Sequence, residues 1–276
     1  MPGPENNVNI DTNVAHMARI YDYLLGGTNH FAVDREVAER VTAALPGGIE
    51  GARTNIRANR DFLAWAVRWL AGEQGIRQFL DIGTGIPNAD NVHAVAQQTA
   101  PDARVVYVDH DPVVLAHAHE LLQSTADGAT AYIDGDLRQP EPILAEASKT
   151  LDLGRPTAVM LLGILHYLPD DEDPYGIVGR VVDAVPSGSY VVVSHLASDL
   201  FPEQMAELAE RHNDGDNDTA EEAVLRDRAQ VARFLDGLEL IDPGVVPLNE
   251  WRPGGTNPLG LGDAVIPIYA AIARKP

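Results

Sequence analysis

Residues 79–93 read FLDIGTGIPNADNVH, an apolar run that ends at an aspartate and continues into two glycines around a threonine. This order predicts a buried strand through Asp81, a turn at Gly83-Thr84-Gly85, and then a helix with Pro87 or Asn88 near its first turn. Glycine accepts positive φ and has no Cβ to hold a ligand away from the backbone. The N-terminus of the helix offers unpaired N–H groups to a carboxylate or phosphate. The pattern indicates a ligand-binding turn, although an ordinary tight strand-to-helix turn has the same residues.

The chain after Gly75 alternates short β-rich runs with helical segments. The β-rich runs are 76–82, 104–109, 130–134, 157–163 and 189–196, and the helical segments lie near 88–98, 112–123, 141–148 and 174–185. The runs are almost continuously apolar, as in strands covered by helices on both faces. This alternation predicts a doubly wound, mostly parallel α/β sheet of right-handed βαβ units, in a Rossmann-like domain over 76–276.

The tail adds a helix near 220–235 and two further β-rich runs, 238–242 and 264–273. No clear helix separates these two runs, so one of them is expected to be antiparallel and the whole sheet to have seven strands. The acidic segment 210–222 is interpreted as a solvated loop or a helix cap.

The first 75 residues are expected to form a helical cap. Residues 11–29 place apolar side chains at i, i+3, i+4 and i+7, and Asp11, Thr12 or Asn13 can cap the start of this helix. Gly26-Gly27 suits its end. Two more helices are predicted near 34–45 and 53–71.

Composition narrows the class of ligand. The formal charge is −21, from 41 acidic and 20 basic residues, and an acidic surface repels the phosphates of nucleic acids. We therefore expect a small-molecule substrate, with no nucleic acid and no membrane partner; the sequence does not indicate an oligomeric state. The chain has no cysteine and no apolar run long enough to cross a membrane, and its first residues do not resemble a signal peptide. These features favour a cytoplasmic location.

Polar side chains follow the next strands of the predicted sheet. Asp109 ends the second strand, where a carboxylate can accept both hydroxyls of a ribose. Asp134 and Asp136 follow the third strand, and Gly163 follows the fourth. Because the carboxyl ends of parallel strands meet at one edge of the sheet, these residues are expected to lie close together and to bind a nucleoside.

The spacing of the glycines favours one adenosine cofactor over another. A dinucleotide fingerprint has a third glycine where this chain has Asn88, and its ribose acid lies about 20 residues further on, closer than Asp109. Asp81 would repel a pyrophosphate but would suit an ammonium group. S-adenosylmethionine, which carries adenine, ribose and an amino-acid end, fits these residues best, and a nicotinamide cofactor is the alternative.

Longer motifs resemble a known family. The runs FLDIGTGIP, YVDHDP, IDGDLRQP, LLGILHYL and VPSGSYVVVSHL resemble those of class I methyltransferases, over residues 76–276. The N-terminal ARIYDYLLGGTNHFAVDREVAER and ARTNIRANRDFL are similar to the actinobacterial S-adenosylmethionine-dependent methyltransferase family also called DUF574. The resemblance implies the methyltransferase fold and S-adenosylmethionine as cofactor, and supplies no acceptor. Pro87-Asn88 departs from the class I pattern, in which a third glycine is common.

On this interpretation the end of each strand binds a different part of the cofactor. Asp81 and the turn backbone hold the methionine end, Asp109 holds the ribose, and Asp136 with Leu137 reads the adenine, with Asp134 as the alternative acid. The predicted cofactor-binding residues are Asp81, Gly83, Thr84, Gly85, Asp109, His110, Asp136, Leu137 and Gly163.

Catalysis needs little beyond alignment, because methyl transfer is an in-line displacement whose leaving group takes no proton. A base is needed only if the acceptor loses a proton. His166, and less strongly His195, could serve because each follows a strand end, unless each only hydrogen-bonds locally and orders a loop. No metal site is expected, because no His-Glu-x-x-His motif is present.

The N-terminal helices are predicted to form a lid over the carboxyl edge of the sheet. Arg19, Tyr21, Tyr23 and His30 would then enclose the methyl group or recognise the acceptor. Arg53, Arg57 and Arg60 line one side of the third predicted helix, and the alternative is that these arginines and Arg19 only pair with nearby carboxylates. The sequence as a whole predicts methyl transfer from S-adenosylmethionine to an unidentified small molecule, with a non-catalytic S-adenosylmethionine-binding or regulatory protein as the alternative.

Overall fold

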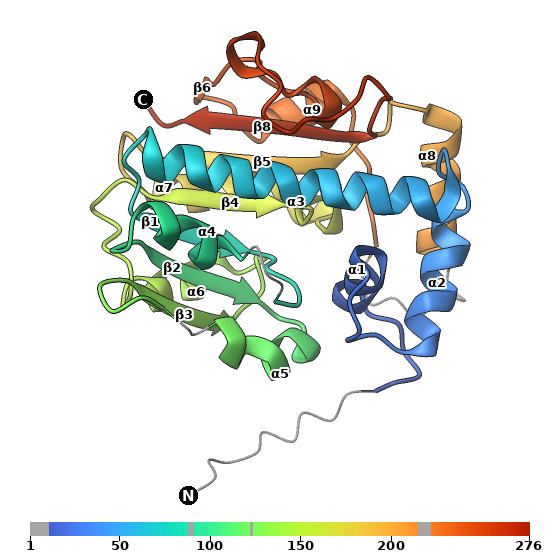
Figure 1. The fold of residues 1–276 in the computed structure, drawn as a ribbon, viewed down its shortest axis with the longest axis horizontal. Helices are drawn as coiled ribbons and strands as arrows, with labels where there is room; N and C mark the ends of the chain where they lie inside the picture. The colour runs from blue at the N-terminus through green and yellow to red at the C-terminus, as the bar shows by residue number, and fades with distance from the viewer. Residues whose placement is uncertain (1–10, 88–90, 122–123, 215–221) are drawn as a thin grey trace, which may run out of the picture.

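The computed structural model describes residues 11–87, 91–121, 124–214 and 222–276. Within these residues one sheet has the order β3-β2-β1-β4-β5-β8-β6, and β7 also pairs with β8 (Figure 1). The strands are β1 (Gln78–Ile82), β2 (Arg104–Asp109), β3 (Ala129–Asp134), β4 (Ala158–Leu162), β5 (Tyr190–Leu196), β6 (Glu239–Leu240), β7 (Val246–Pro247) and β8 (Ile268–Arg274). The helices are α1 (Met17–Leu25), α2 (Ala32–Thr42), α3 (Gly48–Gly72), α4 (Val92–Thr99), α5 (Pro112–Leu121), α6 (Pro140–Ala147), α7 (Pro174–Asp183), α8 (Pro202–Asn213) and α9 (Arg228–Arg233).

The sheet has the doubly wound, mostly parallel arrangement that the sequence predicts. Strands β1 to β5 are parallel, and β8 lies antiparallel beside β5. The chain order reverses direction at β1, which has β2 on one side and β4 on the other. In such sheets the crevice outside the carboxyl ends at this reversal is where ligands bind.

The number of strands differs from the expected seven, because the described residues contain eight. The run 238–242 contributes only Glu239 and Leu240, and the extra segment Val246–Pro247 pairs with the same strand, β8. Both segments are two residues long. Neither carries an apolar alternation long enough to predict a strand.

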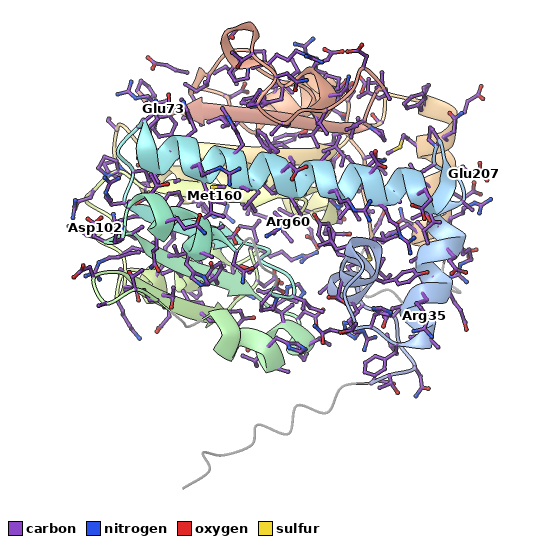
Figure 2. The ribbon with its side chains drawn as sticks, in the orientation of Figure 1. Arg35, Arg60, Glu73, Asp102, Met160 and Glu207 are labelled. Carbon is purple, nitrogen blue, oxygen red and sulfur yellow. The ribbon has the colours of Figure 1, made fainter. Side chains whose placement is uncertain are left out.

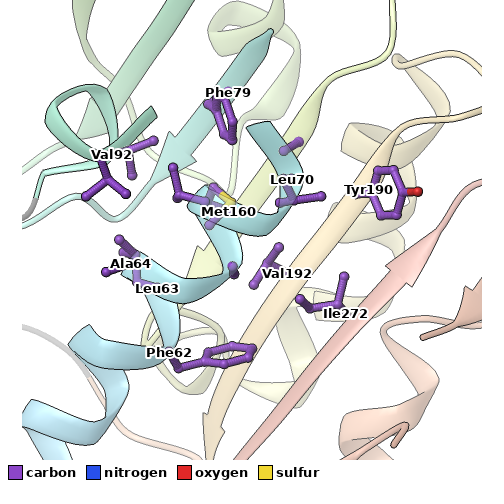
Figure 3. Close-up of a cluster of buried hydrophobic side chains, with 14 of the residues drawn as sticks. Phe62, Leu63, Ala64, Leu70, Phe79, Val92, Met160, Tyr190, Val192 and Ile272 are labelled. Carbon is purple, nitrogen blue, oxygen red and sulfur yellow. The ribbon is translucent and has the colours of Figure 1, made fainter. Parts of the chain in front are cut away.

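Helices cover both faces of the sheet. On one face α3 and α4 pack against the strands, and Figure 3 shows Phe62 and Leu70 of α3 near Met160, Val192 and Ile272. On the other face α6, α7 and α9 share a second core with the same strands. Burying one such aromatic or aliphatic side chain contributes about 1.5–3 kcal/mol, so these two cores fix the strand ends in place.

The cap forms a third core beyond the carboxyl ends of the parallel strands. Figure 1 shows α1, α2 and α8 on the side toward which the arrowheads of β4 and β5 point. Ile20, Val37, Ala52 and Leu208 of this core come from α1, α2, α3 and α8. Helix α3 runs from this cap across the face of the sheet, so one continuous helix couples the cap to the strands.

Several helix boundaries differ from the predictions. Helix α1 begins at Met17, with His16 as its N-cap and no side-chain capping bond, rather than at Asp11, Thr12 or Asn13; its end at Gly26, with φ of 87°, is as expected. Helix α8 was not predicted, because only Met205 and Leu208 of its twelve residues are buried apolar side chains and its sequence ends in the acidic segment. The helix expected near 220–235 is reduced to α9, and residues 215–221 lie outside the described part of the chain.

No helix in the described part of the chain combines the length and the hydrophobicity that crossing a membrane requires.

Candidate functional site

The glycine turn joins β1 to the end of β2. Gly83 and Gly85 have φ of 78° and 68°, which favours glycine at both positions. The Gly83 N–H donates to the Val108 carbonyl at 2.9 Å. A Cβ on Gly83 would come within 2.8 Å of the Ile164 side chain, so the turn and the end of β4 are in close contact. The next helix is α4, which begins at Val92 with Asn91 as N-cap; Asn88, expected near the first turn of this helix, lies outside the described residues.

Asp109 connects this turn to the second strand. Its Oδ2 accepts from the Gly85 N–H at 2.8 Å, and its Oδ1 accepts from the Asp111 N–H at 3.0 Å. Burial raises the pKa of Asp109, and the two backbone N–H bonds act in the opposite direction. Because each carboxylate oxygen has a second lone pair, Asp109 can accept further hydrogen bonds from a ligand.

Asp81 lies at the end of β1 and is 6% exposed. Burial raises the pKa of Asp81 from 3.8 to about 7, because desolvation outweighs the opposing charge of Arg60. Arg60 comes from α3 (Figure 2). Near neutral pH Asp81 is therefore divided between its protonated and ionised forms, and a cation beside it would favour the ionised form.

These groups line one cavity of about 280 Å³, which we call the turn cavity. Its walls come from the sheet through Asp81, Gly83 and Asp109, and from the cap and α3 through Tyr21 and Arg60. A small cavity of about 20 Å³ adjoins it. All nine predicted cofactor residues line at least one of these two cavities. Asp136 and Leu137 line the small cavity but not the turn cavity, and Gly83, Asp109 and His110 line both. The turn cavity but not the small one is lined by Asp81, Thr84, Gly85 and Gly163.

The structure thus brings all nine predicted cofactor-binding residues to two adjoining cavities. It also separates the two alternative acids after β3. Asp136 lines the small cavity and accepts from the Arg138 backbone N–H at 2.9 Å, whereas Asp134 is exposed and lines neither cavity.

An apolar cavity of about 150 Å³ lies beside the turn cavity, between the cap and the ends of β4 and β5. The two cavities share five wall residues: Met17, Tyr21, Asn59, Gly163 and Tyr167. His166 lines the apolar cavity and is buried. Burial, with smaller effects of His195, His212 and Arg226, lowers the pKa of His166 well below its usual range, so its imidazole is neutral at neutral pH.

A model of the S-adenosyl methyltransferase family matches residues 4–276 of this chain. The chain belongs to this family. It is a methyltransferase whose methyl donor is S-adenosylmethionine, and the fold and the cofactor predicted from the sequence are confirmed.

Two solved structures are similar to this methyltransferase over nearly its whole length. A DUF574 family protein from Streptomyces avermitilis is 41% identical, with a TM-score of 0.88, and the match covers 96% of this chain and 99% of that one. A candidate methyltransferase from Thermobifida fusca is 38% identical, with a TM-score of 0.84 over 100% of this chain and 99% of that one. The structure of TnmH, at 18% identity and a TM-score of 0.51 over 83% of this chain and 58% of that one, shares the fold alone. A search of curated proteins found no match.

His195 of the methyltransferase does not have the geometry of a base. Its Nε2 lies 3.2 Å from Arg226 Nη1, which can only donate, so Nε2 accepts. Its Nδ1 therefore carries the proton and donates to the Leu196 carbonyl at 2.8 Å. Burial lowers the pKa of His195 to about 3. With both nitrogens engaged, His195 orders the end of β5, which agrees with the alternative of local hydrogen bonding rather than with a role as the weaker candidate base.

Arg19 was expected to face the acceptor but lies inside the cap. It is fully buried and pairs with Asp34 at 3.0 Å, while its other nitrogens donate to the carbonyls of Val14 and Asp11. Asp34 also accepts from the backbone N–H groups of His16 and Phe31. Arg19 therefore holds the start of α1 to α2, and breaking such a buried pair costs about 3–5 kcal/mol.

Tyr23 and His30 likewise line none of the three cavities described above. The Tyr23 hydroxyl donates to Glu39 at 3.1 Å, and His30 lies 3.3 Å from Asp22. Of the four predicted cap residues only Tyr21 reaches the cavities, where its hydroxyl accepts from Asn59 Nδ2 at 3.3 Å.

The sequence prediction missed several residues of the site. Asn59 and Arg60 come from α3, and His16 and Met17 come from the start of α1. His16 Nδ1 lies 3.3 Å from Asp111 and so links the cap to the loop after β2. Arg60 could have been suspected from the row of arginines on one side of α3, whereas Asn59 carries no signal in the sequence.

Proposed function

We propose that this methyltransferase transfers the methyl group of S-adenosylmethionine to a small molecule held in the apolar cavity. The observation that carries the proposal is the common wall of the two cavities, formed by Met17, Tyr21, Asn59, Gly163 and Tyr167. An acceptor in the apolar cavity would therefore lie next to a donor in the turn cavity. A protein that only bound the cofactor would have no need of the second cavity.

The residues of the turn cavity fit the three parts of the donor. Asp81, a buried carboxylate with a pKa of about 7, would hold the ammonium group, and the backbone of the glycine turn would hold the carboxylate. Asp109 keeps lone pairs for the ribose hydroxyls. The adenine would lie where the turn cavity adjoins the small cavity, with His110, Asp136 and Leu137 of the small cavity's wall beside it.

When bound, S-adenosylmethionine supplies an electrophilic methyl group on a positively charged sulfur. The protein has to align the acceptor with this group and keep water away. Met17 and Tyr21 of the cap line both cavities, and Asn59 Nδ2 donates to the Tyr21 hydroxyl. The faces of Tyr21 and Tyr167 would also favour a positive charge beside them.

His166 is the proposed base for an acceptor that loses a proton. It lines the apolar cavity, it is neutral at neutral pH, and its Nδ1 has no hydrogen-bond partner. A neutral nitrogen in a water-excluded cavity can accept a proton from an acceptor oxygen or nitrogen during transfer. The low pKa also makes His166 a weak base, so this role requires an acceptor whose proton becomes acidic as the methyl group is transferred.

The test is a screen of metabolite extracts with labelled methyl donor, accompanied by calorimetry with S-adenosylhomocysteine. We expect S-adenosylhomocysteine to bind and at least one small molecule to become labelled. Binding without labelling in any extract would favour a regulatory protein over an enzyme that acts on small molecules. Labelling confined to proteins or nucleic acids would contradict the proposed acceptor class.

A further inference from the structure

The apolar cavity has features that narrow the acceptor further. We infer that the acceptor is uncharged and places one hydroxylated aromatic ring in this cavity. The inference rests on the proposed function, because it takes the apolar cavity as the acceptor site. Size, charge, ring contacts and unpartnered polar atoms support it separately.

The size of the cavity corresponds to a single ring. Its volume is about 150 Å³. An engineered apolar cavity of roughly that volume in another protein stays dry and binds benzene. One six-membered ring with a small substituent therefore matches this volume.

The lining of the cavity disfavours a charged acceptor. Within the described residues it contains no Asp, Glu, Lys or Arg side chain, although the chain as a whole has a formal charge of −21. An ion moved from water into such a lining would lose its hydration without gaining a partner of opposite charge. His166 and His195 do not supply a charge either, because burial lowers the pKa of each.

Aromatic rings dominate one side of the cavity. The centroids of His166 and Tyr167 are 4.2 Å apart, those of His166 and His195 are 5.6 Å apart, and those of Tyr167 and His212 are 6.0 Å apart. Rings at such spacings prefer tilted or offset contacts, and an aromatic ligand can extend the cluster in the same way.

Three residues of the lining leave a buried polar atom without a partner: Asn59 Oδ1, His166 Nδ1 and Ser194 Oγ. Their side chains come from α3, the turn after β4, and β5, and the residues are 6%, 5% and 0% exposed. Buried polar atoms are normally hydrogen-bonded, so three unpartnered polar atoms among the lining residues of one apolar cavity are unusual. A hydroxyl group can both donate and accept, so it would pair with such an atom once the side chain rotates toward the cavity, whereas a pure hydrocarbon offers no partner.

The experiment compares four probes: phenol, toluene, benzoate and benzylamine. Binding is measured by ligand-observed NMR titration of the full chain, with and without S-adenosylhomocysteine. We expect phenol to bind about tenfold more tightly than toluene, as one additional buried hydrogen bond implies. Benzoate and benzylamine, which are charged at neutral pH, are expected not to bind.

Variants link this binding to the cavity. Ala52→Leu places extra atoms on the cavity wall. This variant should no longer bind phenol but should still bind S-adenosylhomocysteine. The matched control is Ala43→Leu, at an exposed position just beyond α2. Ser194→Ala, and His166→Phe, which keeps a ring, should each reduce the preference for phenol over toluene. Thermal unfolding of each variant checks that it is folded.

Three results would overturn the inference: tighter binding of benzoate or benzylamine than of phenol, equal binding of phenol and toluene, or an unchanged preference in both polar-atom variants. Absence of phenol binding with S-adenosylhomocysteine bound normally would also overturn it and leave the proposed function in place. Failure of S-adenosylhomocysteine to bind would instead contradict the proposed function, and the titration without it would still decide the inference.

Discussion

Replacing Asp81 by asparagine should stabilise the ligand-free methyltransferase, and the gain should grow with pH. Asp81 is 6% exposed, and burial raises its pKa from 3.8 to about 7. Between these two values the native state binds more protons than the unfolded state. The stability of the wild-type protein therefore falls as pH rises through this window, because ionising Asp81 costs more in the folded protein. Asparagine has nearly the same shape and does not ionise.

The size of the effect follows from the two pKa values. Ionisation of Asp81 lowers the stability of the native state by about 2 kcal/mol at pH 5 and by about 4 kcal/mol at pH 8, relative to strongly acidic solution. The stabilisation by Asp81→Asn should therefore be about 2–3 kcal/mol larger at pH 8 than at pH 5. This difference does not depend on how well the asparagine itself packs.

The assay is denaturant or thermal unfolding of both proteins without ligand at the two pH values. The stabilisation corresponds to a gain in Tm that is at least about 4 °C larger at pH 8 than at pH 5. Asp134→Asn, at an exposed strand end, is the control and should show no such dependence. A stabilisation of equal size at both pH values, or one larger at pH 5, would refute the reasoning about Asp81.

The affinity for the cofactor should rise with pH, whereas the stability of the ligand-free protein falls. If the ionised form of Asp81 holds the ammonium group, the Kd for S-adenosylhomocysteine should rise about tenfold for each pH unit below 7. Calorimetry from pH 8 to pH 5 should then show a loss of about 100-fold in affinity for the wild type. Asp81→Asn should bind weakly throughout, with a flat profile. A wild-type affinity that is constant over this range would remove Asp81 from the ammonium site.

Three further predictions concern other residues of the site. Asp109→Ala should weaken S-adenosylhomocysteine binding by at least about tenfold in calorimetry, because the Gly85 N–H loses its acceptor and the ribose its partner, whereas Asp134→Ala should not. Gly83→Ala should lower stability by more than about 2 kcal/mol, because φ is 78° and the new Cβ would come within 2.8 Å of a neighbouring side chain; Gly237→Ala, with the same φ and open space around it, should cost less. His166→Ala should lower kcat for a proton-losing acceptor at every pH from 6 to 9, without a titration step from His166 in the wild type, and an unchanged kcat would end its proposed role as base.

The candidate cofactor residues could be placed together from the sequence because their positions at the strand ends follow from the topology. Once strands are parallel and helices connect them, the residue after each strand must lie at one edge of the sheet. Asp81 lies near the end of β1, Asp109 ends β2 and Asp136 follows β3, and each lines at least one of the two adjoining cavities. The choice between Asp134 and Asp136 needed the structure, since both follow β3 and the sequence does not say which way the loop turns.

Residues from α3 could not be predicted in the same way. Asn59 and Arg60 lie in the middle of a 25-residue helix, far along the chain from the strand ends that they face. Their part in the site depends on how α3 packs across the sheet, where Phe62 and Leu70 lie in the shared core. Periodicity identifies the apolar face of such a helix but not the height at which it passes the strand ends.

The cap shows a second limit of periodicity. Met17, Tyr21 and Leu24 recur at helical spacing on α1 and line the apolar cavity, whereas Arg19 and Tyr23 lie on other faces and bond to Asp34 and Glu39 of α2. The two sets could therefore be separated from the sequence. The spacing does not indicate whether the apolar face of a helix packs against a filled core or lines a cavity. That depends on the volumes of side chains from α2, α3 and α8, which come together only when the cap has folded.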